Sequence, residues 1–265
     1  MSNPVLFEMN HAAIWQRKVK VWDSHVRAAS LDRLVFLLLH RAGMMGKEEA
    51  ELLNKLIKPG MQILDVGANI GLYTLLLSRL AGETGKVFAF EPEPNLFSIL
   101  CENLSGNGIS NVTSFQCAAG DANGRATFQR GTFNSGDNRL GTGKSGAQAI
   151  EVEVARLDEM VPVRTVDFIK LDVQGYELAA LNGMQQLVAS SPNLRVLFEF
   201  WPAGLRSANA GPESLFKFFH DRDFRIFELE GGQPRQLDTP AALVERLGAK
   251  RYTNLLAARH SLDTL

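Results

Sequence analysis

Acidic side chains recur where the apolar segments of this chain end, and carboxylates at such places can bind hydroxyl groups or cations or accept a proton. Asp65, Glu91, Asp172 and Glu199 stand at or beside the carboxyl ends of four short apolar runs that are typical of buried strands. In a parallel sheet these ends share one edge, and ligands bind there. A sheet edge needs no such carboxylates for its own stability, so their repetition predicts a binding or catalytic site.

A glycine turn follows the first of these strands. Gly67 and Gly71 lie between the predicted strand Met61–Val66 and a predicted helix, Leu72–Leu80. A strand that turns into glycines and opens a helix presents free backbone N–H groups and the positive end of the helix to a ligand. The next strand ends on Glu91, a position suited to the two hydroxyls of a ribose. The unit therefore predicts a nucleoside-type cofactor.

The spacing of the glycines selects among such cofactors. Three residues separate Gly67 from Gly71, which matches neither the G-x-G-x-x-G fingerprint of dinucleotide enzymes nor the P-loop. A nicotinamide dehydrogenase is therefore disfavoured. Asp65 would repel a pyrophosphate but suits the sulfonium and ammonium groups of S-adenosylmethionine. The predicted cofactor-binding residues are Asp65, Gly67, Asn69, Gly71, Glu91, Ala118 and Asp121, with Asp121 near the adenine amino group.

Alternating strands and helices position these residues. Short apolar strands separated by helices are typical of a parallel sheet that is covered on both faces. We therefore expect an α/β, Rossmann-like fold with a mostly parallel seven-stranded sheet and helices on both faces. The strands are predicted at Met61–Val66, Lys86–Phe90, Val112–Ala118, Asp167–Leu171, Leu194–Phe200, Phe224–Leu229 and Asn254–Ala258, and the later helices at Asn95–Leu104, Glu177–Val188, Pro212–His220 and Ala241–Leu247.

Two regions lie outside this alternation. Residues 1–57 are predicted as an N-terminal helical extension of a domain that spans 58–265, because the pattern is helical from about His11 to Ile57. Residues 120–159 form a predicted β-hairpin insertion between strands three and four. Its glycine-rich part, 131–146, is either a lid over the ligand or a floppy hairpin loop.

Four motifs together resemble the FkbM family of S-adenosylmethionine-dependent methyltransferases. They are DVGANIGLYT at 65–74, FEPEP at 90–94, DFIKLDVQGYE at 167–177 and FEF at 198–200. The resemblance implies the class I methyltransferase fold and O-methylation of a hydroxyl, often on a sugar or a natural-product scaffold. A protein of this fold that kept the nucleoside pocket but lost catalysis, as a sensor or scaffold, is the alternative.

Methyl transfer to a hydroxyl requires a nucleophile held about 3 Å from the methyl carbon, and a general base or a divalent cation that helps to remove the proton. Asp172 is the predicted base or metal ligand. By fold analogy with catechol-type enzymes, Asp172 and Glu199 are candidate ligands of Mg²⁺ or another divalent cation. Phe200 follows Glu199 where those enzymes carry an Asn, which weakens this hypothesis.

Further polar and aromatic residues near these strand ends are candidates for acceptor binding. Glu177 either complements the dipole of the helix that it begins or orients Asp172. Lys170 is unexpected inside a buried strand, where it either reaches an edge or pairs with a carboxylate. Trp201 either lines the acceptor pocket or only packs. The predicted substrate residues are Asn138, Arg139, Gln174 and Trp201.

Bulk properties exclude some partners. The net charge of −1 does not indicate binding to nucleic acid. The basic residues between His11 and Arg41 form either a solvated helix face or a contact surface for an anionic partner. Leu34–Leu39 is too short to span a bilayer. Two cysteines and the lack of a signal-peptide pattern favour the cytoplasm. We expect a small-molecule or glycan acceptor, no nucleic acid and no stable membrane insertion; no motif indicates the acceptor's identity or the oligomeric state.

Overall fold

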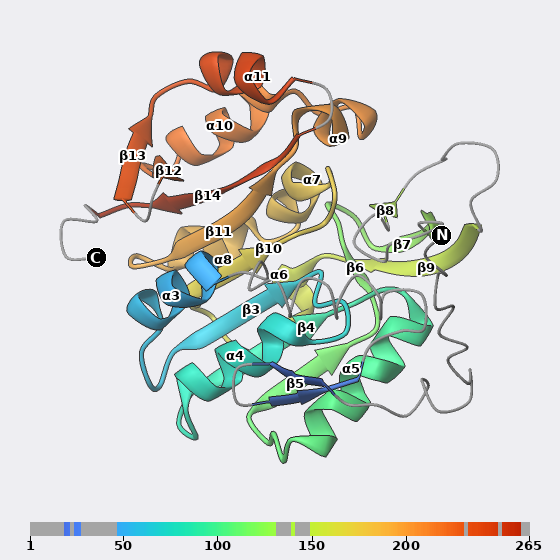
Figure 1. Ribbon diagram of the computed structural model, residues 1–265. Helices are drawn as coiled ribbons and strands as arrows, with labels where there is room; N and C mark the ends of the chain where they lie inside the picture. The colour runs from blue at the N-terminus through green and yellow to red at the C-terminus, as the bar shows by residue number, and fades with distance from the viewer. Residues whose placement is uncertain are drawn as a thin grey trace, which may run out of the picture.

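The computed structural model describes residues 19–21, 24–27, 47–130, 139–140, 149–230, 233–248 and 251–260. Strands and helices alternate over most of these ranges (Figure 1). The main sheet contains β3 (Gln62–Val66), β4 (Lys86–Phe90), β5 (Val112–Phe115), β10 (Phe168–Leu171), β11 (Arg195–Phe200), β12 (Arg225–Glu230), β13 (Gln233–Leu237) and β14 (Thr253–Ala258). The helices are α3 (Lys47–Leu56), α4 (Leu72–Ala81), α5 (Pro94–Gly106), α6 (Leu157–Met160), α7 (Glu177–Asn182), α8 (Gln185–Ser190), α9 (Pro202–Ser207), α10 (Pro212–His220) and α11 (Ala241–Leu247).

The strand order of the main sheet is β13-β12-β14-β11-β10-β3-β4-β5. The five strands from β11 to β5 are parallel, whereas β14 runs antiparallel to both of its neighbours. From β3 the chain proceeds to β4 and β5 on one side, and from β10 it proceeds to β11 on the other. The strand order therefore reverses between β3 and β10, and ligands bind at such a switch point.

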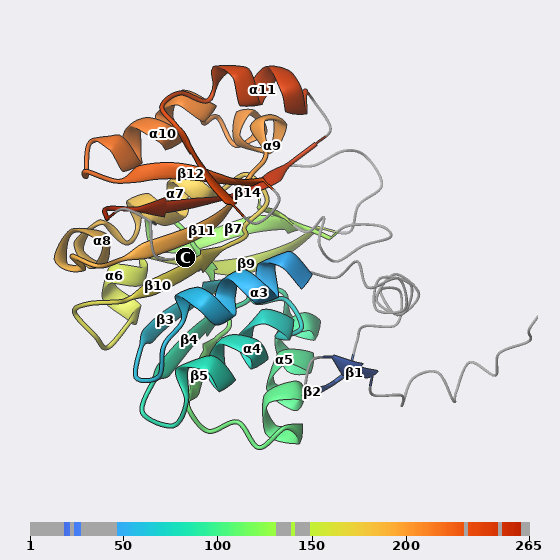
Figure 2. The ribbon, with the colours of Figure 1, turned by 60° about the vertical axis from the view of Figure 1, so that its left-hand side comes forward.

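Helices cover both faces of this sheet (Figure 2). Because successive residues of a strand point to opposite faces, Ile63 packs with α3 and α4, while Leu64 belongs to the core on the other face, with α7, α8, α10 and α11. The helices α4 and α5 share a third cluster with Ala89 of β4. Most of the buried apolar side chains thus lie between the sheet and its helices, as the α/β prediction required.

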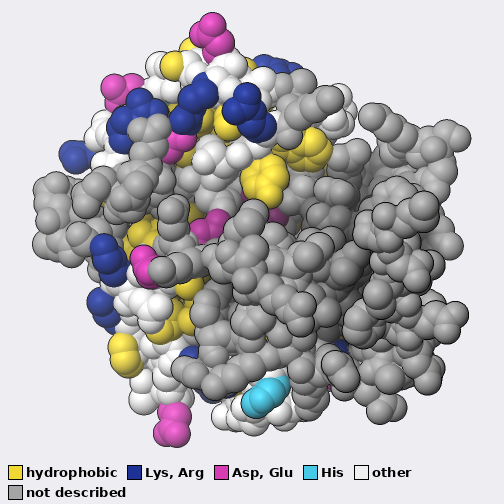
Figure 3. Space-filling view, viewed as in Figure 1, with side chains coloured by type: hydrophobic (Ala, Val, Ile, Leu, Met, Phe, Trp, Pro, Cys, Tyr) yellow, Lys and Arg dark blue, Asp and Glu magenta, His cyan; other side chains and the backbone are white. Residues whose placement is uncertain are grey.

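The sheet has eight strands rather than the predicted seven, because β13 pairs with β12 as an additional edge strand. Glu228 of β12 is buried and pairs with Arg235 of β13, at 2.7 Å, and with Arg246 of α11. Figure 3 shows Lys and Arg side chains gathered over the C-terminal elements at the top of the view. These ion pairs fasten the edge strand and α11 to the sheet.

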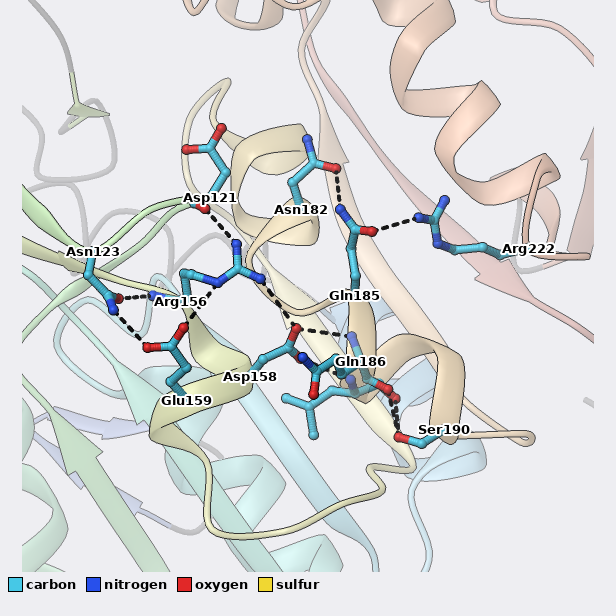
Figure 4. Close-up of polar contacts among 11 residues, drawn as sticks. Asp121, Asn123, Arg156, Asp158, Glu159, Asn182, Gln185, Gln186, Ser190 and Arg222 are labelled. Carbon is cyan, nitrogen blue, oxygen red and sulfur yellow. Dashed lines mark hydrogen bonds and ion pairs between the residues drawn. The ribbon is translucent and has the colours of Figure 1, made fainter.

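The insertion after β5 forms a separate small sheet of β6 (Ala118–Ala119), β7 (Gly124–Gln129), β8 (Arg139–Leu140) and β9 (Ala149–Ala155). Within it, β7 pairs antiparallel with both β9 and β8, and β6 pairs parallel with β9. At its base, the Arg156 guanidinium donates to the carbonyl of Asp121 at 2.7 Å, and the Arg156 N–H donates to Asn123 at 2.8 Å (Figure 4). The Asp158 carboxylate accepts from the N–H of Gln186 in the first turn of α8 at 3.0 Å. Polar contacts therefore fix the insertion to the main domain.

Two predicted helices differ from the structure. The helix expected over Glu177–Val188 is divided into α7 and α8 at Gly183, where the backbone approaches Gly120 so closely that an added Cβ would lie 1.9 Å from the Gly120 carbonyl oxygen. Within the segment predicted to be helical up to Ile57, β1 (Val19–Val21) and β2 (Ser24–Val26) form an antiparallel pair.

Two asparagines explain this strand pair: Asn103 lies in α5 and Asn107 is the C-cap of that helix. Asn103 and Asn107 accept from the N–H groups of Arg27 and His25, at 2.7 and 2.9 Å, and donate back to the same residues' carbonyls. Backbone polar groups are thereby satisfied without a helix. The helix α3 does occupy the end of the predicted helical segment, and the division of the chain at residue 57 remains a prediction. None of the helices within the described ranges is long and apolar enough to span a membrane.

Candidate active site

A cavity lies at the carboxyl ends of β3, β4 and β10, at the reversal of strand order. Its empty volume is about 670 Å³, part of which is open to solvent. Six of the residues predicted for cofactor, catalysis or substrate line it: Gly67, Asn69, Glu91, Ala118, Asp172 and Gln174. The ends of β3, β4 and β10 therefore converge on one cavity, whereas Glu199 of β11 is not among the residues that line it.

The glycine turn after β3 brings the backbone close to β10. The N–H groups of Gly67 and Ala68 both donate to the carbonyl of Phe90, at 3.0 and 2.9 Å. Gly67 has a φ of 87°, and a Cβ added there would lie 1.9 Å from the carbonyl oxygen of Asp172. Only glycine meets both conditions. Gly71, with a φ of 86°, begins α4 and does not line the cavity.

Glu91 is held rigidly beside this turn. One carboxylate oxygen accepts from the N–H of Asn69 at 2.8 Å, and the other accepts from the N–H of Glu93 at 2.9 Å. Burial raises the pKa of Glu91 to about 7, and the two backbone donors oppose this rise. Each oxygen of a carboxylate has a second lone pair, so Glu91 can still accept hydrogen bonds from a vicinal diol in the cavity.

Two acidic residues predicted to bind the cofactor are not brought to the cavity. Asp65 is fully buried on the α3–α4 face, where it accepts from the hydroxyl of Thr74 at 2.6 Å. Burial raises the pKa of Asp65, partly opposed by the charge of Lys170. Asp121 is exposed beside a second hollow between the insertion and α7, and its carboxylate points away from Arg156 (Figure 4). Contacts of these side chains with the ammonium and adenine groups therefore find no support in this geometry.

Asp172, one residue past β10, has both carboxylate oxygens engaged. One accepts from the Lys170 ammonium at 3.1 Å, and the other accepts from the Gln174 amide at 2.9 Å. The side chain is 37% exposed and lines the cavity. Glu177 accepts from the N–H groups of Val173 and Gly175, at 3.3 and 3.1 Å, and so holds the turn that follows Asp172. A fixed carboxylate at a cavity wall can accept the proton of a bound hydroxyl.

A line of polar side chains crosses the sheet on the face covered by α3 and α4. We call it the polar row; its members are Asp65 of β3, Lys170 of β10, Glu199 of β11 and Asn254 of β14. Lys170 is the register partner of Asp65, and Glu199 is that of Asn254. Polar groups on four neighbouring strands thus reach the same face near the cavity.

Glu49 of α3 lies over this row. Its carboxylate accepts from the Tyr73 hydroxyl and from the Asn254 amide. Burial and the charge of Glu49 raise the pKa of Tyr73, so the hydroxyl stays protonated. Sequence reasoning missed Glu49, Tyr73 and Asn254, because 205 residues separate Glu49 from Asn254 and no local pattern links them. Lys170 did give a signal, as a charge within an apolar strand.

The predicted divalent cation does not fit these residues. The Asp172 oxygens already contact an ammonium and an amide N–H group, and the Lys170 ammonium would repel a dication. Burial first, and then the charges of Asp172 and Glu177, raise the pKa of Glu199 to about 9, which favours its neutral form. Within the described residues, no three His, Cys, Asp or Glu side chains gather as metal ligands. The Mg²⁺ hypothesis for Asp172 and Glu199 is therefore not retained.

The residues predicted for the acceptor lie in different places. Gln174 lines the cavity. Trp201 follows β11, is half-buried, and lies against Gly204 of α9 rather than in the cavity wall. Arg139 belongs to β8, and Asn138 and most of the glycine-rich segment 131–146 lie outside the described residues. Phe128 and Leu140 of the insertion line the cavity and were not predicted.

Comparison with known proteins identifies the family. The model of the methyltransferase FkbM domain matches residues 65–226, which contain the glycine turn, Glu91, Asp172 and Glu199. The chain belongs to the FkbM methyltransferase family. Its S-adenosylmethionine-dependent methyltransferase character and its class I fold, both predicted from the motifs, are thereby confirmed.

Individual relatives of this FkbM-family chain cover part of its length. Methyltransferase sdnD of Sordaria araneosa is 29% identical, over 54% of this chain and 68% of its own. The hexuronic acid methyltransferase AglP of Haloferax volcanii is 31% identical, over 48% of this chain and 51% of its own. A crystal structure of a putative rRNA methylase from Clostridium thermocellum superposes with a TM-score of 0.50 at 10% identity, covering 81% of this chain and 94% of that one, which shows a shared fold alone.

Proposed function

We propose that this chain transfers the methyl group of S-adenosylmethionine to a hydroxyl of a small-molecule or glycan acceptor, with Asp172 as the general base. The observation that carries the proposal is the shared cavity: Glu91, suited to a ribose, and Asp172, suited to a proton, line the same space. Both carboxylates are held in place by hydrogen bonds. A site that fixes its groups in advance lowers the entropic part of the barrier.

The cavity residues suit each part of the cofactor. Glu91 would accept hydrogen bonds from the ribose hydroxyls, and Ala118 with Leu96 would border the adenine. The turn at Gly67 and Asn69 would lie along the amino-acid portion. The cofactor's sulfonium would then lie toward Asp172. S-adenosylmethionine supplies an electrophilic methyl carbon, and no metal ion is assigned to the step.

In the proposed reaction the acceptor oxygen attacks the methyl carbon while Asp172 takes the hydroxyl proton. A carbon–oxygen bond forms, the carbon–sulfur bond breaks, and its electron pair remains on sulfur, which gives the neutral thioether S-adenosylhomocysteine. The proton on Asp172 then passes to solvent, because this side chain is partly exposed. A positioned base of this kind contributes roughly 100- to 10,000-fold to a rate.

For the acceptor, the relative that methylates hexuronic acid, by its name, supports a sugar hydroxyl as the first candidate. A natural-product alcohol is the second candidate. Gln174, whose amide donates to Asp172 at the cavity wall, suits an acceptor that carries several hydroxyls.

A labelled-methyl assay tests the proposal. Purified protein is incubated with methyl-labelled S-adenosylmethionine and a panel of free hexuronic acids, their glycosides, and polyketide alcohols, with Asp172→Asn as the inactive comparison. We expect a labelled methyl ether from at least one hydroxyl acceptor. Binding of S-adenosylhomocysteine without transfer to any panel member would instead favour a cofactor-binding scaffold, and label on nitrogen or carbon would contradict O-methylation.

A further inference from the structure

Lys170 is a buried cation that the proposed reaction does not use directly. Its side chain is 8% exposed, its ammonium lies 3.1 Å from a carboxylate oxygen of Asp172, and the same ammonium is 4.5 Å from the centre of the Tyr73 ring. Burial alone lowers the pKa of Lys170, but the charges of Asp172, Asp65 and Glu49 outweigh burial and raise it. The Lys170 side chain therefore remains a protonated ammonium group near neutral pH.

The surroundings of Asp172 are otherwise acidic. Charge interactions link Asp172 or its partner Lys170 to five other titratable groups: Asp65 from β3, Tyr73 from α4, Glu177 from α7, Glu199 from β11 and Glu49 from α3. Among these described residues, Lys170 is the one that carries a positive charge. Like charges destabilise the ionised form of a carboxylate, and an adjacent cation stabilises it.

Lys170 contacts Asp172 rather than the space in which the reaction would occur. It is not among the residues that line the cavity, whereas Asp172 is. The ion pair fixes one oxygen of Asp172, and the Gln174 amide fixes the other. Without the ammonium, the carboxylate would keep one directional partner and would face neighbouring acids with no compensating charge.

We propose that Lys170 is a positioning residue for methyl transfer: its ammonium, 3.1 Å from one carboxylate oxygen, holds the Asp172 carboxylate turned toward the cavity. The proposal rests on the proposed function of Asp172 as the base. It also explains why the donor set at Asp172 does not suit a metal ion.

Three variants separate the charge of Lys170 from its bulk. Lys170→Met removes the charge and keeps most of the length of the side chain, whereas Lys170→Arg keeps the charge. The control, Lys217→Met, removes an exposed lysine of α10 that pairs with Asp221 and lies away from the cavity. We expect Lys170→Met to lower kcat about 30-fold or more, as loss of an oriented base would.

The other readouts are expected to stay near the wild-type values. The Kd for S-adenosylhomocysteine should change less than about threefold in Lys170→Met, because the lysine does not line the cavity. Lys170→Arg should keep most of the wild-type rate, because the guanidinium can still pair with Asp172, and Lys217→Met should leave the rate unchanged. Treatment of the wild-type protein with a chelator should leave its rate unchanged.

Crystal structures of the variants with S-adenosylhomocysteine bound provide a second test, which does not require a known acceptor. In Lys170→Met the Asp172 carboxylate should leave its position at the cavity wall, and in Lys170→Arg it should remain there against the guanidinium. If Lys170→Met does not fold, the Lys170→Arg structure still decides, because displacement of Asp172 in it would overturn the proposal. An unmoved Asp172 in Lys170→Met, a wild-type rate in Lys170→Met, or rescue of a chelated enzyme by Mg²⁺ would also overturn it. Failure of the wild-type protein to methylate any hydroxyl would defeat the proposed function instead.

Discussion

The two sides of the cavity are built differently. On the side of β3 and β4, the backbone forms most of the site. Gly67 allows the ends of β3 and β10 to lie close together, and backbone N–H groups hold the Glu91 carboxylate in place. On the side of β10, β11 and β14, side chains hold the site together: Lys170 pairs with Asp172, and Asn254 donates to Glu49. The contacts of the first side lie within one short stretch of sequence, whereas those of the second include a pair 205 residues apart.

We propose that the two sides also differ in function. The backbone-built side suits a cofactor whose shape is the same in every turnover, because a glycine turn and a carboxylate meet an invariant nucleoside. The side-chain network suits an acceptor that differs between relatives, because substitutions there leave the strands in place. The predictions below therefore perturb one side at a time and ask whether the other is affected.

The largest expected effect is on the rate after a change at the base. Asp172→Asn keeps the shape of the side chain but removes the basic group, so kcat should fall about 100-fold or more. Binding of S-adenosylhomocysteine, measured by calorimetry, should change less than about threefold, since the cofactor contacts lie mainly on the other side. Asp221→Asn, in an exposed ion pair on α10, is the control. A rate for Asp172→Asn close to that of the wild type would remove Asp172 as the base.

A change in the glycine turn should affect stability most. Gly67→Ala places a methyl group 1.9 Å from the Asp172 carbonyl at a φ of 87°, so the free energy of unfolding should fall by about 3 kcal/mol or more. Gly108→Ala is the matched control, because its φ is also positive, at 67°, with open space around it. The free energy of unfolding of Gly108→Ala should fall by about 1 kcal/mol. Urea denaturation measures this free energy for both variants. Equal losses in Gly67→Ala and Gly108→Ala would show that the close approach at Gly67 is not required.

Removing the charge of Glu91 should weaken the cofactor side alone. Glu91→Gln is expected to raise the Kd for S-adenosylhomocysteine about 10- to 100-fold, because hydrogen bonds to a charged group contribute about 1.5–3 kcal/mol. Glu102→Gln, on the exposed face of α5, provides the control and should bind like the wild type. An unchanged Kd for Glu91→Gln would mean that the ribose lies elsewhere.

The same carboxylate predicts a smaller pH effect. Burial raises the pKa of Glu91 to about 7, so the group becomes protonated as the pH falls through this value. The ionised form accepts hydrogen bonds from two hydroxyls better than the neutral form does. The Kd for S-adenosylhomocysteine should therefore rise up to about tenfold between pH 8 and pH 6. Calorimetry over this range should find little pH dependence in Glu91→Gln; a wild-type Kd that does not change would contradict the assignment.

Much of the cofactor side could be predicted from the sequence. The bounds of β4, α10 and α11 match the prediction, and Gly67, Asn69 and Glu91 line the cavity. Asp65 was misplaced because side chains alternate along a strand. Val66 reaches the cavity, whereas Asp65 points to the opposite face beneath α4. A pattern identifies a strand end more reliably than the face to which each of its residues points.

The errors elsewhere have tertiary causes. Asp121 was expected at the adenine; it follows β6 and lines a neighbouring hollow rather than the cavity, so its role stays a prediction. The strand pair β1–β2 replaces part of a predicted helix because Asn103 of α5 and Asn107, its C-cap, satisfy the backbone of that pair. Glu49 reaches the polar row through the packing of α3, which no short-range pattern encodes.

The most direct test of the account is a crystal structure of the protein with S-adenosylhomocysteine bound. We predict that the ribose hydroxyls contact the carboxylate of Glu91 and that the sulfur faces Asp172 across the cavity. A nucleoside bound outside this cavity, or one whose sulfur points away from Asp172, would contradict the central claim that a single cavity joins the cofactor to its base.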